Sequence, residues 1–150
     1  MPQFFLTNCI CETLTQPLDT LIVVAAALSG DEGRWLLQQR PEGASLAGLW
    51  EFPGGKIDVG EDAEMALRRE LKEELRIDVA SGSAAPIAFS TGRAGDRALV
   101  LLLYRIDEWQ GEPEPLHATD LGWFTPEEMR ELAMPAADIP LIASLGPASG

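Results

Sequence analysis

The chain has 150 residues, of which 46% are hydrophobic, and 24 acidic against 11 basic side chains give it a formal net charge of −13. This length and composition predict one globular domain that buries its own core. The excess of acidic side chains argues against a nucleic-acid polymer as partner, because binding a phosphate backbone depends on Lys and Arg. Two cysteines and one histidine are too few for a zinc site.

Residues 1–19 show no clear periodicity, so we treat them as an N-terminal extension of uncertain order before a domain of residues 20–150. The start lacks a basic region, and Thr7 and Asn8 interrupt its apolar residues, unlike a secretory signal peptide. No apolar run in the sequence reaches membrane-spanning length. We therefore expect a cytoplasmic protein in which Cys9 and Cys11 are free or buried thiols. The sequence leaves the oligomeric state open, with a monomer favoured.

Strand patterns dominate the chain on both sides of one helix. The apolar run 20–28 predicts a strand buried on both faces, and 35–39 predicts its hairpin partner across a turn at 29–33. Further along, the sequence predicts a loop at 78–85, a hairpin of strands 86–90 and 98–106 around a turn at 92–96, a short strand at 121–124, a helix from Thr125-Pro126 to about Leu132, and a last helix within 135–145. Together these elements predict an α/β domain with a mixed β-sheet covered on both faces.

The central helix carries three glutamates on one surface. Apolar residues at helical spacing set its inner face, and Glu70, Glu73 and Glu74 fall at i, i+3 and i+4. One interpretation is a solvated helix face on which Arg68, Arg69 and Lys72 serve as ion-pair partners. The other is a cluster of hard oxygen ligands of the kind that magnesium requires. The helix by itself favours the first interpretation.

The residues before and after these glutamates change that balance. Gly55, Glu61, the run 69–74 with Arg-Glu-Leu-Lys-Glu-Glu, and Ile77 occur at the separations of the Nudix box, and the segment resembles that family. The one departure is Arg76, which stands where the box has a glycine at the helix C-cap. A left-handed arginine costs about 1 kcal/mol there and leaves the carboxylates in place.

The resemblance implies an α/β/α Nudix sandwich and a set of roles for these residues. Glu70, Glu74 and usually Glu73 would coordinate Mg²⁺, for which Mn²⁺ is expected to substitute, helped by a backbone carbonyl at Gly54 or Gly55. Glu70 is also the expected general base, and Arg69 is expected to orient the carboxylates. Glu61 is expected to support the loop before the helix first and to take part in catalysis second.

The segment 38–56 resembles the bacterial MutT branch of the family. In that branch the arginine matching Arg40 contacts substrate phosphate, so Arg40 and Lys56 are candidate substrate-binding residues; an ordinary exposed arginine is the alternative for Arg40. The segment 134–142 resembles the one that reads the purine edge, which makes Asp138 a candidate for base recognition. The alternative for Asp138 is a helix N-cap.

A distal loop departs from the MutT pattern. His117 stands where MutT-like enzymes often have a further glutamate, and a neutral histidine is a poor magnesium ligand. The missing acidic role would be taken by Asp120, by Glu112 or Glu114, or by no residue. An exposed loop histidine is the plainer interpretation of His117.

These features predict an enzyme that acts on a small-molecule nucleotide. Our leading hypothesis is a magnesium-dependent nucleoside triphosphate pyrophosphohydrolase that cleaves 8-oxo-dGTP to the monophosphate and pyrophosphate, which would link it to nucleotide-pool sanitation and DNA repair. The second hypothesis keeps the chemistry with CTP, another dNTP or a nucleoside diphosphate derivative. The third is a non-catalytic Nudix-like module that binds a base or a partner protein.

Overall fold

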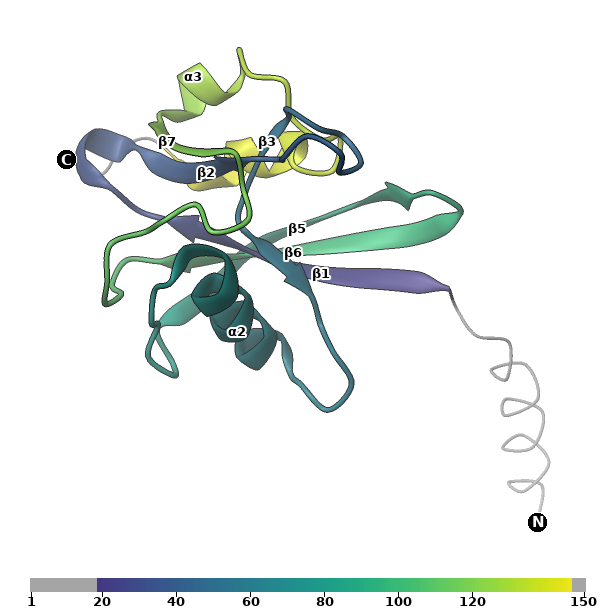
Figure 1. Ribbon diagram of the computed structural model, residues 1–150, viewed down its shortest axis with the longest axis horizontal. Helices are drawn as coiled ribbons and strands as arrows, with labels where there is room; N and C mark the ends of the chain where they lie inside the picture. Colours follow the sequence, from purple (N-terminus) through teal and green to yellow (C-terminus); the bar gives the residue numbers. More distant parts are fainter. Residues whose placement is uncertain (1–18, 147–150) are drawn as a thin grey trace.

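The computed structural model describes residues 19–146 and arranges them in two sheets with helices around them (Figure 1). The elements in chain order are β1 (Thr20–Leu28), the 3-10 turn η1 (Asp31–Gly33), β2 (Trp35–Gln39), β3 (Trp50–Glu51), β4 (Gly54–Lys56), α2 (Ala63–Leu75), β5 (Ala84–Ala94), β6 (Arg97–Ile106), β7 (Asp120–Phe124), α3 (Pro126–Met129) and the 3-10 helix η2 (Ile139–Leu145). Our expectations for residues 1–18, including Cys9 and Cys11, lie outside the described residues. No helix within residues 19–146 is long and apolar enough to cross a membrane.

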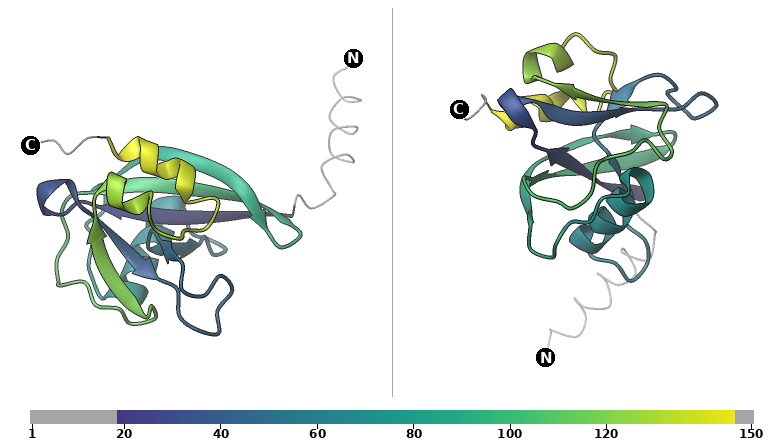
Figure 2. Two further views of the ribbon diagram at one scale, coloured as in Figure 1. Left: turned by 90° about the horizontal axis from the view of Figure 1, so that it is seen from above. Right: turned by 60° about the vertical axis from the view of Figure 1, so that its left-hand side comes forward.

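The larger sheet is mixed, which confirms the predicted fold class. Its strand order is β4-β1-β6-β5, with β1 parallel to β6 and antiparallel to β4. The smaller sheet is antiparallel and has the order β3-β2-β7. Helix α2 lies on one side of the larger sheet, and η2, α3 and the smaller sheet lie on the other (Figures 1 and 2).

The second half of β1, residues 24–28, is buried on both faces, as its apolar run predicted, whereas Ile22 in the first half is exposed. Val24, with Ala26 and Leu28, packs toward α2, whereas Ala25 and Ala27 pack into the second core on the opposite side. Small alanine side chains let both layers approach the same strand closely. The strand at the centre of the domain is thereby fixed from both sides.

The predicted hairpin of β1 and β2 is wrong. Only one isolated bridge, Ser29 to Trp35, joins the two segments, and β2 pairs with β3 and β7 instead. Both edges of β1 are already occupied by β4 and β6, so β2 cannot pair alongside it. The turn after β1 therefore carries the chain from the larger sheet to the smaller one.

The second predicted hairpin, β5 with β6, is confirmed, although β5 is longer than expected. It begins at Ala84, within the loop predicted at 78–85, and continues past the expected end at Ser90 to Ala94. It lies at the edge of the larger sheet. The register shifts between Pro86 and Ala88, which is how an edge strand accommodates a proline.

Local signals placed the short helix α3 but overestimated its length. Thr125 and Glu128 form the full capping box that starts it, with Pro126 in the first turn, yet it ends at Met129 rather than near Leu132. The last predicted helix is the 3-10 helix η2, which begins at Ile139 with a proline in its first turn.

Helix α2 begins and ends as its sequence indicates. The side chain of Asp62 caps its N-terminus by accepting from the backbone N–H of Met65 at 2.8 Å. Its buried face consists of Ala66, Leu67, Leu71 and Leu75, which pack against the larger sheet. Arg76 adopts the left-handed C-cap conformation with φ 58° and ψ 35°, as expected for a residue at the position of the box glycine.

Candidate active site

The residues that the sequence singled out gather where the chain passes from the smaller sheet to the larger one. β3 belongs to the smaller sheet and β4 to the larger, and only Phe52 and Pro53 separate them. Pro53 accepts a hydrogen bond from the N–H of Ala26 at 2.8 Å, which locks this crossing onto β1. The crossing therefore brings residues of both sheets beside the outer face of α2.

The two glycines at the start of β4 allow α2 and β1 to approach closely. A Cβ atom at Gly54 would clash with the backbone of Val24 and Ala25. A Cβ atom at Gly55 would clash with the carboxylate of Glu70. Glycine at position 55 is thus required for the Glu70 carboxylate to lie against the β4 backbone, and glycine at position 54 allows β4 to lie close to β1.

Glu74 is partly buried, and no basic side chain within residues 19–146 donates a hydrogen bond to it. One of its oxygens accepts from Gln38 Nε2 at 3.2 Å and from the N–H of Gly54 at 3.3 Å. Burial, followed by the negative charge of Glu70, raises the pKa of the Glu74 carboxyl to about 7. Burial likewise raises the pKa of Glu70, against the lowering effect of Arg69.

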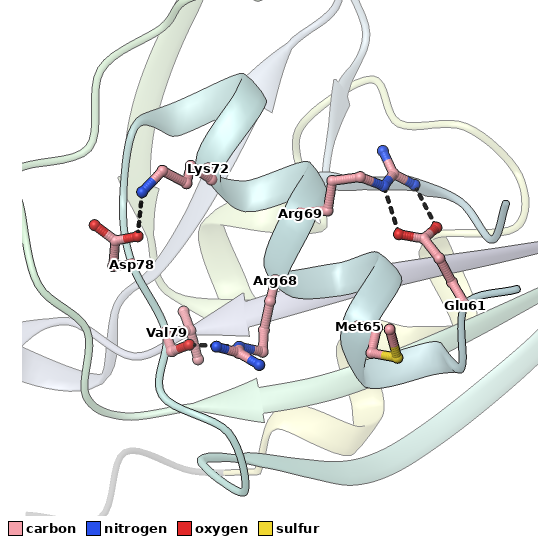
Figure 3. A pocket seen from close by; sticks show the side chains of 7 residues that line it. All are labelled: Glu61, Met65, Arg68, Arg69, Lys72, Asp78 and Val79. Carbon is pink, nitrogen blue, oxygen red and sulfur yellow. Dashed lines mark hydrogen bonds and ion pairs between the residues drawn. The ribbon is translucent and has the colours of Figure 1, made fainter.

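Arg69 links the loop before α2 to the glutamates of the helix. Its Nε and Nη2 atoms donate to the two carboxylate oxygens of Glu61 at 2.7 and 2.8 Å, as Figure 3 shows, and Nη1 donates to Glu70 at 2.9 Å and to the more exposed Glu73 at 3.3 Å. Nη2 also donates to the carbonyl of Lys56, whose side chain is exposed at the end of β4. These bonds lower the pKa of Glu61 and raise that of Arg69.

The donor set suits a divalent cation, although its side chains are engaged with one another. Within residues 19–146, no three acidic, histidine or cysteine side chains converge on one point. Glu70 and Glu74 nevertheless supply hard carboxylate oxygens on one face, and the close approach at Gly55 places backbone beside them. Burial raises the pKa of both carboxyls, and the charge of Glu70 raises that of Glu74 further, so a divalent cation would stabilise their ionised forms. The residues therefore fit the metal that the sequence led us to expect.

Arg40 is tied to an acidic residue that the sequence analysis missed. Its Nη1 atom donates to both carboxylate oxygens of Glu51 at 3.0 and 3.1 Å, and its Nε atom donates to the carbonyl of Ser45 at 2.6 Å. Burial raises the pKa of Glu51, opposed by the nearby charge of Arg40. The only sequence signal for Glu51 was its position as an acid between two aromatic residues, Trp50 and Phe52.

Asp138 reaches the site from the far end of the chain. It is 5% exposed, and its carboxylate accepts from the backbone N–H of Phe52 at 3.1 Å. It makes no side-chain cap on η2, so the N-cap interpretation is wrong. Burial is the main cause that raises its pKa to about 7, and the charge of Glu51 acts in the same direction. Asp138 and Glu51 are therefore close enough to influence one another.

The loop that carries His117 contacts the backbone of Glu74. The N–H of Leu116 donates to the Glu74 carbonyl at 3.0 Å, next to the exposed His117. Glu114 forms an ion pair with Arg76 at 3.3 Å, and Asp120 accepts from the adjacent N–H of Leu121. The acidic residues whose charge raises the pKa of Glu74 are Glu70 and Glu51, and neither belongs to this loop.

The hollow in Figure 3 lies along the flank of α2, and neither Asp138 nor Glu51 is among the residues that line it. It has a volume of about 310 Å³ and is lined by Glu61, Met65, Arg68, Arg69, Lys72, Asp78 and Val79. Its basic side chains already have partners: Arg68 donates to the Val79 carbonyl at 2.7 Å, and Lys72 pairs with Asp78 at 2.6 Å. We therefore place the chemistry at the glutamates and not in this hollow.

Comparison with known proteins decides the family. A family model described as the NUDIX domain matches residues 19–145. The chain is a member of the Nudix family. It is 36% identical over 122 residues to the CTP pyrophosphohydrolase of Escherichia coli K12, covering 81% of this chain and 89% of that protein. It is 38% identical over 117 residues to an 8-oxo-dGTP diphosphatase of Haemophilus influenzae, covering 71% and 85%.

A solved structure supports the same assignment. The solution structure of the E. coli ORF135 protein matches with a TM-score of 0.74 and 36% identity over 83% of this chain and 87% of that chain. The protein is thus a Nudix hydrolase, an enzyme that acts on nucleotide phosphoanhydride bonds, as the glutamate spacing led us to expect. Nudix hydrolases generally need a divalent metal, and α2 is the helix of the Nudix box.

Proposed function

We propose that this Nudix hydrolase is a magnesium-dependent nucleoside triphosphate pyrophosphohydrolase of MutT type, with Mn²⁺ able to replace Mg²⁺. The observation that carries the proposal is the placement of Glu70 and Glu74 against the glycines of β4, with raised pKa values and no basic residue bonded to Glu74. A bound divalent cation would screen the phosphate charges and lower the pKa of an attacking water molecule.

The chain's own residues would share the remaining work. Glu70 is the proposed general base, since its carboxylate lies at the glycine-rich crossing and burial raises its pKa. Arg69 would hold Glu70 and Glu73 in place through its bonds to both. Glu70, Glu73 and Glu74 are the proposed metal ligands, together with a backbone carbonyl of Gly54 or Gly55. Arg40 and Lys56 are the proposed contacts to the substrate's phosphates.

Asp138 is the proposed reader of the base. When protonated, its carboxyl both donates and accepts a hydrogen bond. It therefore fits the edge of a base that has one hydrogen-bond donor beside one acceptor. The N7–H and O6 groups of 8-oxoguanine form such an edge, whereas guanine offers two acceptors there. A pKa of about 7 keeps part of the population protonated at neutral pH. On this basis 8-oxo-dGTP is our first candidate substrate and nucleotide-pool sanitation the corresponding role.

CTP is the second candidate, and two observations favour it. The E. coli CTP pyrophosphohydrolase is one of the most similar relatives, at 36% identity over 122 residues. Cytosine also presents a donor beside an acceptor, its N4 amino group and N3, and a carboxylate accepts well from N4. Asp138 can therefore form hydrogen bonds with either 8-oxoguanine or cytosine, and a comparison of substrates distinguishes the two.

A panel of substrates tests the proposal. Pyrophosphate release would be measured with 8-oxo-dGTP, dGTP, CTP and ADP-ribose, with and without magnesium, and compared as kcat/KM. We expect 8-oxo-dGTP to exceed dGTP by about a hundredfold or more. An equal rate with dGTP would rule out the sanitising role, and a clear preference for CTP would establish the second candidate. Absence of metal-dependent turnover with every nucleotide would instead support a non-catalytic binding module.

A further inference from the structure

Gln38 is a buried polar residue placed between two carboxylates. It is 5% exposed on β2, where it is the direct cross-strand partner of Glu51. Its Nε2 atom donates to Glu74 at 3.2 Å. Gln38 is the first residue of the MutT-like segment 38–56, but the sequence pattern predicted no role of its own for it.

The other end of the same amide lacks a partner. The Oε1 atom of Gln38 is buried and accepts no hydrogen bond from any residue within 19–146. Leaving a buried acceptor unsatisfied costs about 1–3 kcal/mol. Turning the amide over would not remove the problem, because Oε1 would then face the carboxylate of Glu74. The observed orientation therefore places a strong acceptor beside the glutamate cluster with nothing bound to it.

A hydrated cation supplies what this arrangement lacks. Magnesium keeps several of its water molecules when protein carboxylates bind it, and those waters donate hydrogen bonds to nearby acceptors. Glu74, one of the proposed ligands, already accepts from Gln38 on the same side. The Gln38 amide would then donate to the metal ligand Glu74 and accept from a water molecule of the hydration shell. Both of its polar atoms would have a hydrogen-bond partner.

We infer that Gln38 is a positioning residue for the cation site: its Nε2 group fixes the Glu74 carboxylate, and its Oε1 atom accepts a hydrogen bond from the hydration shell of the bound cation. This inference rests on the proposed function, since it requires Glu74 to be a metal ligand. It explains why a polar side chain occupies a buried position on β2.

Binding of Mn²⁺ to the whole chain tests the inference without relying on turnover. We would measure the Kd by isothermal titration calorimetry for the wild type and for Gln38→Met, which keeps the side-chain length and removes both polar groups. Gln39→Met is the matched control, because Gln39 lies next in the same strand and donates to Gly48 on the other side. We expect the Kd to rise about tenfold or more in Gln38→Met and to stay unchanged in Gln39→Met.

Stability separates positioning from a structural role. Gln38→Met removes one unsatisfied buried acceptor and one hydrogen bond to Glu74, whose effects on stability oppose each other, so the metal-free variant should unfold close to the Tm of the wild type. A lower Tm with an unchanged Kd would assign Gln38 a structural role only and overturn the inference. A wild type that binds no Mn²⁺ would instead overturn the proposed function itself.

A measurement on the wild type covers the case in which Gln38→Met fails to fold. The side-chain amide signals of Gln38 would be followed by ¹H–¹⁵N NMR during a titration with Mg²⁺. We expect them to shift with the same midpoint as the metal binding, whereas the Gln39 amide signals stay in place. If the Gln38 signals do not move while magnesium binds, the inference is wrong.

Discussion

Asp138 accepts a hydrogen bond from the backbone N–H of Phe52 at 3.1 Å, across 86 positions of sequence. This bond joins the segment before η2 to the crossing that leads into β4 and α2. The proposed base-reading residue is thereby held by the same stretch that carries Glu51 and the glycines beside Glu70. The proposed base-reading residue and the proposed metal ligands are thus connected through one short crossing between the two sheets.

The pH dependence of stability tests the ionisation of Asp138. Its pKa in the folded protein is about 7, above its ordinary value of 3.8, so the folded state binds the proton more tightly than the unfolded state. The stabilisation from Asp138 is therefore complete below about pH 4 and is lost as the pH rises through about 7. Asp138→Asn can still accept from Phe52 and lacks this titration.

Urea unfolding of both proteins at several pH values measures the effect. The stability of Asp138→Asn relative to the wild type should increase by about 4 kcal/mol between about pH 4 and about pH 8. A difference that does not change with pH would mean that Asp138 titrates near its ordinary value.

The same titration should change how well the enzyme uses 8-oxo-dGTP. Protonated Asp138 can donate to O6 of 8-oxoguanine and accept from N7–H, whereas the ionised carboxylate only accepts. Asp138→Asn keeps both a donor and an acceptor at every pH. The kcat/KM of the wild type for 8-oxo-dGTP, divided by that of Asp138→Asn, should therefore fall as the pH rises through about 7. Ionisation of the triphosphate cancels in this ratio because both proteins use the same substrate. A ratio that does not change with pH would exclude this role for Asp138.

Arg40→Ala should weaken substrate binding more than turnover. If Arg40 contacts phosphate mainly in the ground state, KM rises about tenfold and kcat changes less. The variant also leaves Glu51 buried without its ion-pair partner, so we expect a loss of stability of about 1–3 kcal/mol. The double variant with Glu51→Gln serves as control: it should regain stability without regaining KM. A fall confined to kcat would place Arg40 in transition-state stabilisation instead.

Glu74→Gln should abolish magnesium-dependent turnover while leaving the fold intact. The amide keeps an oxygen that can accept from Gln38 and Gly54, but it lacks the charge that a divalent cation requires. We expect kcat/KM to fall by at least about a thousandfold. Circular dichroism and Tm are the controls for folding. Activity close to that of the wild type would remove Glu74 from the set of metal ligands.

Local sequence patterns predicted the parts of the fold that depend on local chemistry. The apolar run of β1, the face of α2 and the capping box at Thr125 were each visible in a short window, and the structure confirms them. The pairing of β1 depends instead on β6, whose residues lie 78 positions later in the chain. A turn between two apolar runs therefore suggested a hairpin that long-range pairing excludes.

The site was predicted only as far as its motif extends. The spacing of Gly55, Glu61 and the glutamates was enough to place α2 and its carboxylates. The roles of Gln38 and Glu51 depend on burial and on neighbours from other strands, so no local pattern marked them. The N-cap interpretation of Asp138 failed for the same reason, because a backbone N–H distant in sequence binds its carboxylate.

The most direct test of the central claim is diffraction from crystals soaked with Mn²⁺ and a non-hydrolysable triphosphate. We predict an anomalous manganese peak roughly 2.0 to 2.3 Å from carboxylate oxygens of Glu70 and Glu74, in contact with the phosphates. A peak bound elsewhere, or a triphosphate lying away from α2, would contradict the account.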